Sequence, residues 1–388
     1  MDKNIRKELI QASKLYRKRE YVQSLEIFQR NYQNSPEEFS PEQRGLYAWA
    51  IYQVHVKNFT DGEELFEAVE EIFDIVPQAD LSKAKTCPIA LSTMKVIDEL
   101  YAEEDYYGLI YWAERVNPDF LASQRGKFHG RVTRSMKERY FDKVTKAYLE
   151  CEEYEKCINL SKKALESLKR FTNNSDTWYR WRIAKSLKEL KRHEEALKYL
   201  KEVVEVKNDW YVHKEFVDNY ISLQRDDEAR NHVCEAILGK GPSNYKVNLY
   251  SQIYHLLKDS EPEIAMRHAE LYYLLKIDTQ AFMDEEIEDL DIDETQLDQK
   301  ELEREIHDYW RQFKFKNRQL QYGTVTQFFD DKNYGFITTE NDESIFFHKN
   351  EFDGDAVFIG QMVSFYTEKS FDKSKNEESI KAVNVKAE

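Results

Sequence analysis

The sequence has few cysteines and no long apolar run. Its four cysteines, Cys87, Cys151, Cys157 and Cys234, do not show the spacing of a metal site. We therefore expect four reduced thiols in a helical core. No run approaches the roughly 18 apolar residues that a membrane-spanning helix needs, and the N-terminus leads into a charged amphipathic helix instead of a signal peptide. These absences argue against a disulphide-rich or membrane-spanning protein and predict a cytoplasmic one.

Catalytic and cofactor motifs are also absent. The sequence contains no phosphate-binding Gly-Lys-Ser/Thr loop and no Gly-x-Ser-x-Gly nucleophile elbow. The nine histidines do not fall at metal-ligand spacing; His193 and His232 are isolated residues of predicted helices. The acidic run from Asp284 to Glu294 lacks the central glycine of a calcium-binding loop. We therefore expect a protein that is not an enzyme and that uses no metal or cofactor.

Basic residues are fewer than acidic ones, which gives a net charge of −16, and the acidic residues are unevenly distributed. Residues 278–308 hold 14 acidic and 2 basic residues, whereas residues 1–277 have a net charge of only −2. Residues 323–388 have a net charge of −6 and cannot depend on bulk attraction to phosphate. We read residues 278–322 as a flexible acidic linker followed by an amphipathic helix. Residues 309–322 carry four basic residues and no acid, and we expect these four to contact nucleic-acid phosphates beside the barrel: Arg311, Lys314, Lys316 and Arg318.

Residues 1–277 show apolar residues at helical spacing and a degenerate internal repeat. Each copy has an aromatic or polar residue, then a small residue three positions later, then packing positions a further four and seven along, as in Tyr21, Ser24, Phe28 and Asn31. The positions aligned with Ser24 in the other copies are Gly62, Leu109, Cys157, Ala196, Ala229 and Ala265. From Cys157 onward they are 39, 33 and 36 residues apart, near the period of about 34 residues of one helical-repeat family.

The repeat resembles the tetratricopeptide family over about seven units. The resemblance implies a superhelix of helical hairpins, each buried only against its neighbours, with a concave surface that binds a peptide or protein. The alternative is an irregular helical bundle.

One stretch of the helical region is strongly basic. The region from Arg125 to Arg139 gathers six basic residues against the single acid Glu138, and it includes Arg125, Lys127, Arg131 and Arg134 as a possible second binding site. Gly126 and Gly130 predict a loop, followed by a helix that begins near Arg131 and places Arg131, Arg134 and Glu138 on one face. These cations could guide a nucleic-acid backbone or hold an acidic partner, or they could form a solvated helix face.

Two short strands near the C-terminus carry aromatic residues on one face. Because successive side chains of a strand point to opposite faces, Tyr334 and Phe336 share a face, as do Phe346 and His348. Flat rings on a sheet can stack unpaired bases, since every base has a π-face. Packing of these rings against the helical region is the alternative.

Residues from about Gly323 to Val385 resemble a cold-shock domain, a five-stranded OB-type barrel that binds single strands. Residues 332–338, with the sequence KNYGFIT, resemble its first ribonucleoprotein motif, and residues 345–348, IFFH, resemble the second. The resemblance implies base stacking by Tyr334, Phe336, Phe346 and His348. It also implies that Phe328 extends this surface and that Lys332 meets phosphate. Three positions depart from the family pattern: Thr326, Gln327 and Lys349 replace a lysine, a tryptophan and an aromatic residue.

The sequence therefore predicts a multidomain α plus β protein. We expect a tetratricopeptide-like superhelix over residues 1–277, an acidic linker and connecting helix over 278–322, and a cold-shock-like barrel over 323–388. The predicted function is that of a bacterial adaptor: the barrel holds single-stranded RNA or DNA, and the superhelix docks a protein partner. The alternative is a protein–protein scaffold whose barrel does not bind nucleic acid.

Overall fold

The computed structural model describes residues 3–76, 87–277, 282–354, 356–372 and 377–388. It divides into two compact units, residues 1–225 and residues 226–388, which we take in turn. None of the helices in these ranges combines the length and the apolar character needed to cross a lipid bilayer.

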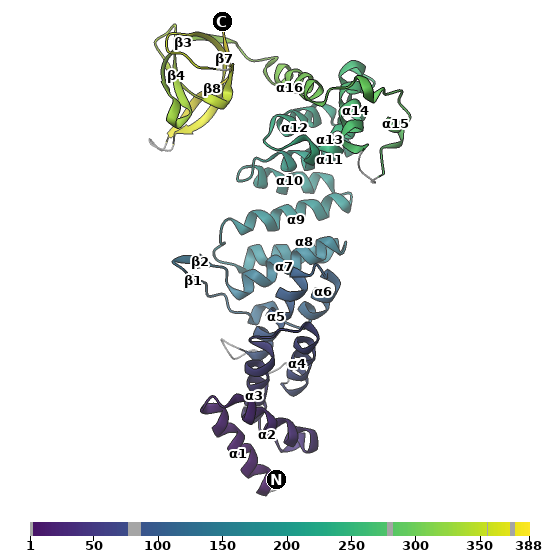
Figure 1. Cartoon of the computed structure of the whole chain (residues 1–388), viewed down its shortest axis with the longest axis vertical. Coiled ribbons are helices and arrows are strands. Elements are labelled where there is room, and N and C mark those ends of the chain that lie inside the picture. The colour runs from purple at the N-terminus through teal and green to yellow at the C-terminus, as the bar shows by residue number, and fades with distance from the viewer. Residues whose placement is uncertain (1–2, 77–86, 278–281, 355, 373–376) are drawn as a thin grey trace. The chain divides into compact units, whose positions relative to one another are not determined.

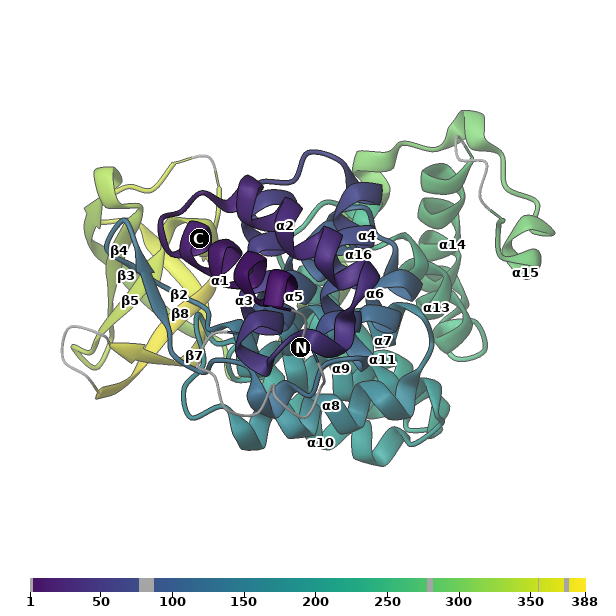
Figure 2. The ribbon, with the colours of Figure 1, turned by 90° about the horizontal axis from the view of Figure 1, so that it is seen from below.

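The first unit consists of successive helices stacked one after another along the chain (Figure 1). Turning the view by a quarter shows the same helices from below (Figure 2). The helices of this unit are α1 (Lys3–Arg17), α2 (Tyr21–Asn34), α3 (Pro41–Ile51), α4 (Gly62–Ile75), α5 (Pro88–Ala102), α6 (Tyr106–Glu114), α7 (Met136–Glu150), α8 (Tyr154–Ser167), α9 (Ser175–Glu189), α10 (His193–Val204) and α11 (Trp210–Ser222). The expected helical-hairpin architecture is confirmed.

The repeat pattern locates the second helix of six of the seven hairpins. Helices α2, α6, α8 and α10, with α12 (Asp226–Leu238) and α14 (Pro262–Lys276) of the second unit, all begin at the first residue of the motif, which is a proline in the last copy. The small-residue positions are buried, and where they are polar they bond to the preceding helix: the Ser24 hydroxyl donates to the Ala12 carbonyl at 2.9 Å, and the Cys157 thiol donates to the Thr145 carbonyl at 3.3 Å. Small side chains are needed here because the two helices approach closely.

The second helix of the second hairpin begins three residues later than the repeat pattern predicts. Helix α4 begins at Gly62 because the Asp61 carboxylate caps it, accepting the backbone N–H groups of Glu63 at 2.8 Å and Glu64 at 3.3 Å. Leu65 and Val69 are therefore its buried packing positions, and Gly62 is only half-buried.

The basic stretch does not form the helix expected near Arg131. Gly126–Phe128 (β1) and Arg131–Thr133 (β2) form an antiparallel hairpin instead, and α7 starts at Met136, where Ser135 caps the Glu138 N–H at 3.1 Å. The turn residues His129 and Gly130 both have positive φ, 47° and 77°, as a two-residue hairpin turn requires. The predicted shared face of Arg131, Arg134 and Glu138 is therefore wrong.

The helices of the second unit are α12, α13 (Val247–Leu257), α14, the short α15 (Glu285–Glu288) and α16 (Gln299–Phe315). Helix α16 packs against α12 and α14. Its Trp310 is fully buried and donates its indole N–H to His268 Nε2 at 3.0 Å, while the Cys234 thiol donates to the Trp310 carbonyl at 3.3 Å. The amphipathic helix expected from the sequence is confirmed, and its apolar stripe docks on the helices that precede it.

Part of the acidic segment makes contacts that its composition did not predict, and its residues 278–281 lie outside the described residues. The Asp284 carboxylate accepts from the Ser251 hydroxyl at 2.6 Å and lies 2.8 Å from His255 Nε2. Glu286 forms an ion pair with Lys258 at 2.8 Å, and Ile287 is fully buried. The carboxylates of this segment find their partners in and just after α13, and its short helix α15 packs against α14.

Burial of His268 makes the stability of the second unit dependent on pH. Its Nδ1–H donates to the Ile264 carbonyl at 2.7 Å, so neutral His268 accepts the Trp310 N–H on Nε2, and burial lowers its pKa to about 4. The unfolded chain protonates this residue near its ordinary pKa of about 6.5, so the contribution of His268 is complete above that pH. We expect it to fall by about 1.4 kcal/mol for each pH unit between roughly 6.5 and 4. The free energy of unfolding of the parent minus that of His268→Gln should therefore decrease as the pH falls through this range. A constant difference would contradict this expectation.

The C-terminal part of the second unit is a closed barrel. Its strands are β3 (Gln321–Phe329), β4 (Tyr334–Thr339), β5 (Ser344–His348), the two-residue β6 (Phe352–Asp353), β7 (Met362–Asp372) and β8 (Glu377–Ala387). The strand order is β5-β4-β3-β7-β8-β6, and pairing of β5 with β8 closes the barrel. Its core is apolar, with Val325, Ile337, Phe347, Val363 and Phe365 fully buried. The predicted five-stranded barrel is confirmed, with β6 as a short addition.

Candidate nucleic-acid interface

The outer face of β4 and β5 carries the predicted aromatic surface. Antiparallel pairing sets Phe336 opposite Phe346 and Tyr334 opposite His348, and all four side chains are half-buried. The residues between them, Gly335, Ile337, Ile345 and Phe347, are buried on the inner side. The alternation expected from the sequence therefore places these four residues together.

The rings of this face touch one another and lie at different angles. The centroid of the Tyr334 ring is 5.5 Å from that of Phe346 and 5.9 Å from that of Phe336, and Phe336 and Phe346 are 5.9 Å apart. The Phe329 ring lies 5.1 Å from the Tyr334 ring. We call Phe329, Tyr334, Phe336 and Phe346 the aromatic platform. Adjacent rings that are half-exposed offer several faces to unpaired bases.

Phe329, and not Phe328, extends the platform. The pairing of β3 with β4 shifts between Val325 and Gln327, so Phe328 pairs with Gly335 and Phe329 with Tyr334. Phe328 packs against the core, stacked 6.2 Å from the Phe347 ring, whereas Phe329 is 37% exposed. The expectation for Phe328 is corrected because the bulge reverses the faces of these two residues.

Gly335 is required where the bulged strand crosses β4. A Cβ atom at this position would lie 2.5 Å from the Gln327 carbonyl oxygen and 2.6 Å from Cε1 of Phe347. A side chain here would push apart the strands that carry the platform.

Two polar groups border the platform. His348 Nδ1 accepts the Asn350 N–H at 3.3 Å, so the neutral ring carries its proton on Nε2. Lys332 places its ammonium 5.8 Å from the centroid of the Phe329 ring. Both residues lie beside the platform, Lys332 as the cation expected to meet phosphate and His348 as a ring expected to stack a base. Lys349, in contrast, forms an ion pair with Asp330 at 2.9 Å.

The basic segment of α16 is engaged with the other side of the barrel. Lys314 lies 3.0 Å from Glu235 and 3.2 Å from Glu368 of β7, and Arg318 lies 3.3 Å from Glu368. The Phe315 ring stacks on that of Tyr366 at 4.4 Å, and Arg311 pairs with Asp308 at 3.5 Å. Lys316 lines the same cleft as Arg311 and Arg318. This segment thus joins α16 to β7, and at least Lys314 and Arg318 use their charge within the chain.

Glu368 of β7 is the carboxylate with which both Lys314 and Arg318 form their ion pairs. Burial acts to raise the pKa of its carboxyl, but Lys314, Lys381 and Arg318 together hold that pKa below its ordinary value. Lys381 is paired with Phe346 across β8 and β5. Lys381 therefore brings a cation to the edge of the platform. The sequence alone does not predict this cation, because only closure of the barrel brings Lys381 and Phe346 together.

The second basic site is divided by the hairpin. Arg134 pairs with Asp142, so it is neutralised within the helical unit, whereas Arg125 leads into β1 and Lys127 and Arg131 lie on exposed strands.

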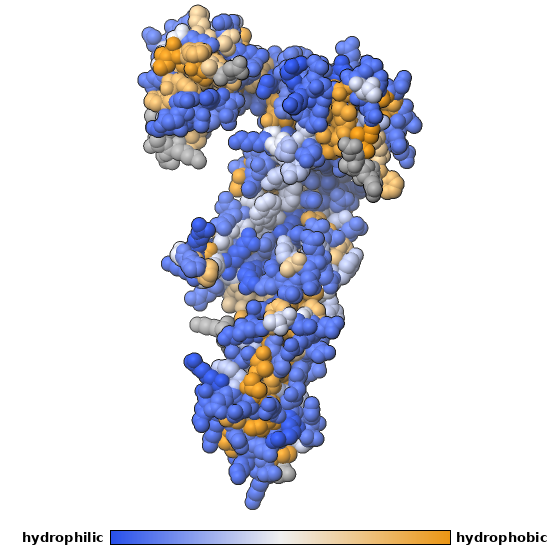
Figure 3. All heavy atoms as spheres, in the orientation of Figure 1, coloured by the Kyte–Doolittle hydropathy of each residue, from blue (hydrophilic) through white to orange (hydrophobic). Residues whose placement is uncertain are grey.

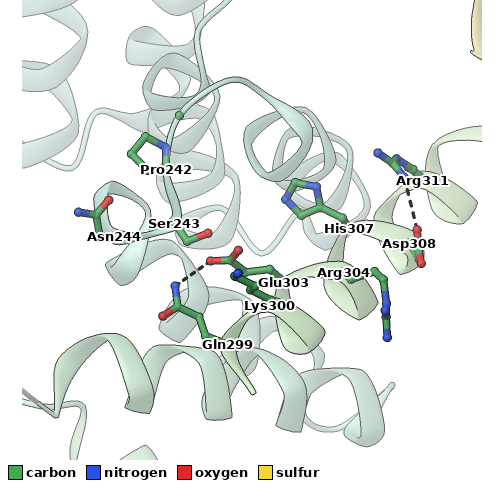
Figure 4. Close-up of a pocket in the computed structure, with 11 residues that line it drawn as sticks. Pro242, Ser243, Asn244, Gln299, Lys300, Glu303, Arg304, His307, Asp308 and Arg311 are labelled. Carbon is green, nitrogen blue, oxygen red and sulfur yellow. Dashed lines mark hydrogen bonds and ion pairs between the residues drawn. The ribbon is translucent and has the colours of Figure 1, made fainter. Parts of the chain in front are cut away.

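A polar recess of about 500 Å³ lies between α16 and the turn before α13 (Figure 4). Its charged side chains are largely paired: Arg311 with Asp308, Arg304 with Glu301, and Glu303 with the Gln299 amide at 3.0 Å. In the described ranges, no group of three or more His, Cys, Asp or Glu side chains could hold a metal ion.

Comparison with known families decides the nature of the barrel. Residues 321–387 match the 'Cold-shock' DNA-binding domain. The cold-shock domain thus begins two residues before the predicted boundary and contains the whole aromatic platform. A comparison with curated protein sequences gives no match.

Solved structures resemble the helical part. RapI in its apo form is 12% identical with a TM-score of 0.42, covering 73% of this chain and 79% of its own. A TPR repeat-containing protein from Cytophaga hutchinsonii is 13% identical with a TM-score of 0.39, covering 70% of this chain and 96% of its own. YrrB, described as a TPR protein with an unusual peptide-binding site, is 16% identical with a TM-score of 0.32, covering 54% of this chain and 90% of its own.

Proposed function

We propose that the cold-shock domain binds single-stranded nucleic acid by stacking unpaired bases on the aromatic platform. The observation that carries this proposal is the contact of four half-exposed rings, all within 5.9 Å of a neighbour, on one outer face of the barrel. The domain is acidic, so stacking must supply much of the affinity. Lys332, Lys381 and the Nε2–H of His348 would meet phosphates or base edges around it.

The test is a titration of the full chain with a labelled single strand and with the duplex of the same sequence. Base faces are free only in the single strand, so we expect that strand to bind and the duplex to bind much more weakly. Preference for the duplex would contradict base stacking as the mode of binding, and no binding of either would favour the alternative, a scaffold whose barrel does not bind nucleic acid.

We also propose that the helical repeats dock a protein partner, so that the chain acts as a non-catalytic adaptor. Neighbouring helices α9 and α11 present half-buried aromatic side chains: Trp181 lies 5.5 Å from Tyr211, and Tyr211 lies 6.1 Å from Trp210. Large amphipathic rings of this kind are enriched at protein interfaces.

Replacing Trp181 and Tyr211 by alanine should abolish co-purification of the partner with the tagged full chain while leaving nucleic-acid affinity unchanged. Retention of the same partners by the variant would place the docking surface elsewhere.

A further inference from the structure

The hairpin β1–β2 has no place in the functions proposed so far. It projects from the side of the helical unit (Figure 1), and all six of its strand residues are exposed. An isolated two-stranded hairpin without a core is at best marginally stable in water. Phe128 is 68% exposed and Val132 is 48% exposed, so the hairpin shows apolar surface that nothing in the described part of the chain covers.

Much of the charge of the hairpin also lacks a partner among the described residues. Among the described residues, the side chains of Lys127 and Arg131 form no ion pair, and Arg125 has a buried guanidinium nitrogen without a hydrogen-bond acceptor. The cations that follow on the helical side behave differently: Arg134 pairs with Asp142, Lys137 with Asp119 and Arg139 with Asp98. A local excess of cations persists here in a chain whose net charge is −16.

The register of the hairpin arranges these groups for an anionic, aromatic ligand. Phe128 pairs directly with Arg131, so an exposed ring and a guanidinium share one face. Lys127 pairs with Val132 on the other face, and the His129 ring lies 4.2 Å from the Phe128 ring at the turn. A base can stack on Phe128 while the adjacent phosphate meets Arg131, a combination that an acidic peptide would use only in part.

We propose that the β1–β2 hairpin is a second binding site for single-stranded nucleic acid, contacting a base through Phe128 and phosphates through Lys127 and Arg131. This inference rests on the proposed function in that both sites take the same class of ligand. The two nevertheless use different residues in different units of the chain, so each can fail alone.

The test uses the full chain and a fluorescein-labelled oligothymidylate, with affinity measured over a range of salt concentrations. Lys127→Gln with Arg131→Gln should reduce the slope of log affinity against log salt by about 1.4, since each phosphate contact on a single strand contributes about 0.7. Phe128→Ala should weaken binding by about 5- to 150-fold. The matched control, Lys14→Gln with Lys18→Gln, removes two exposed cations, one in α1 and one just after it, and should leave the slope unchanged.

The same substitutions are then made in a chain whose platform carries Phe336→Ala and Phe346→Ala. If the hairpin substitutions remove the affinity and the salt dependence that remain in that platform variant, the result supports the hairpin site independently of the platform. Weakening by the hairpin substitutions alone, with none from the platform substitutions, would retain this inference and contradict the proposed function. A salt slope equal to that of the control would overturn the inference and leave the hairpin as a contact for an acidic protein. The hairpin side chains are outside the core, so unchanged melting temperatures are expected throughout.

Discussion

Replacing Phe336 and Phe346 together by alanine is expected to weaken single-strand binding by roughly 2–6 kcal/mol. Each ring that stacks on a base contributes about 1–3 kcal/mol, and these two rings face one another across β4 and β5. The measurement is the affinity of the full chain for a labelled unstructured oligonucleotide, with folding followed by circular dichroism.

Two further variants separate stacking from general apolar contact. Phe336→Leu with Phe346→Leu keeps apolar bulk but removes the flat faces, so it should bind nearly as weakly as the alanine variant. Phe358→Ala with Phe371→Ala removes two exposed rings of the same barrel that lie outside the platform, and should bind as the parent does. Figure 3 shows several apolar patches on the visible face of the barrel, which makes this second comparison necessary. Equal losses in both alanine variants would mean that apolar surface, and not the platform, holds the strand.

Replacing Trp310 by alanine is expected to destabilise the second unit by about 3–5 kcal/mol. The side chain is fully buried, and its removal creates a cavity between α16 and the helices it packs on. It also leaves His268 Nε2 without its 3.0 Å hydrogen bond. We expect the melting temperature of the unit to fall by roughly 6–20 °C in calorimetry.

Phe282→Ala is the matched control for this substitution, because Phe282 is an aromatic residue of the same unit that is 100% exposed. It should change the free energy of unfolding by less than about 0.5 kcal/mol. If Trp310→Ala is as mild as this control, then the packing of α16 on α12 and α14 does not stabilise the unit.

The sequence predicted the elements that depend on local pattern. Six of seven repeat registers were right because the helix start and the small residue lie in one short motif. The second copy is shifted because the Asp61 cap, and not the first residue of the motif, sets the start of α4. The shared face of Tyr334, Phe336, Phe346 and His348 was also predicted correctly, because the alternation of side chains along a strand is a local property.

What could not be predicted depends on distant contacts. A single extra residue in β3 exchanges the faces of Phe328 and Phe329, and composition does not show where a bulge falls. The acidic segment looked like a spacer because its partners, His255 and Lys258, lie on a separate helix. The sequence does indicate the hairpin turn at His129 and Gly130, because a residue that tolerates positive φ precedes a glycine between the two short strands.

The central claim, that bases stack on the platform, is tested most directly by nuclear magnetic resonance on the full chain with labelled phenylalanine rings and bound oligothymidylate. The account predicts intermolecular Overhauser contacts from the Phe336 and Phe346 rings to thymine protons, together with upfield shifts of those protons. Binding without such contacts, or contacts only from rings outside the platform, would contradict it.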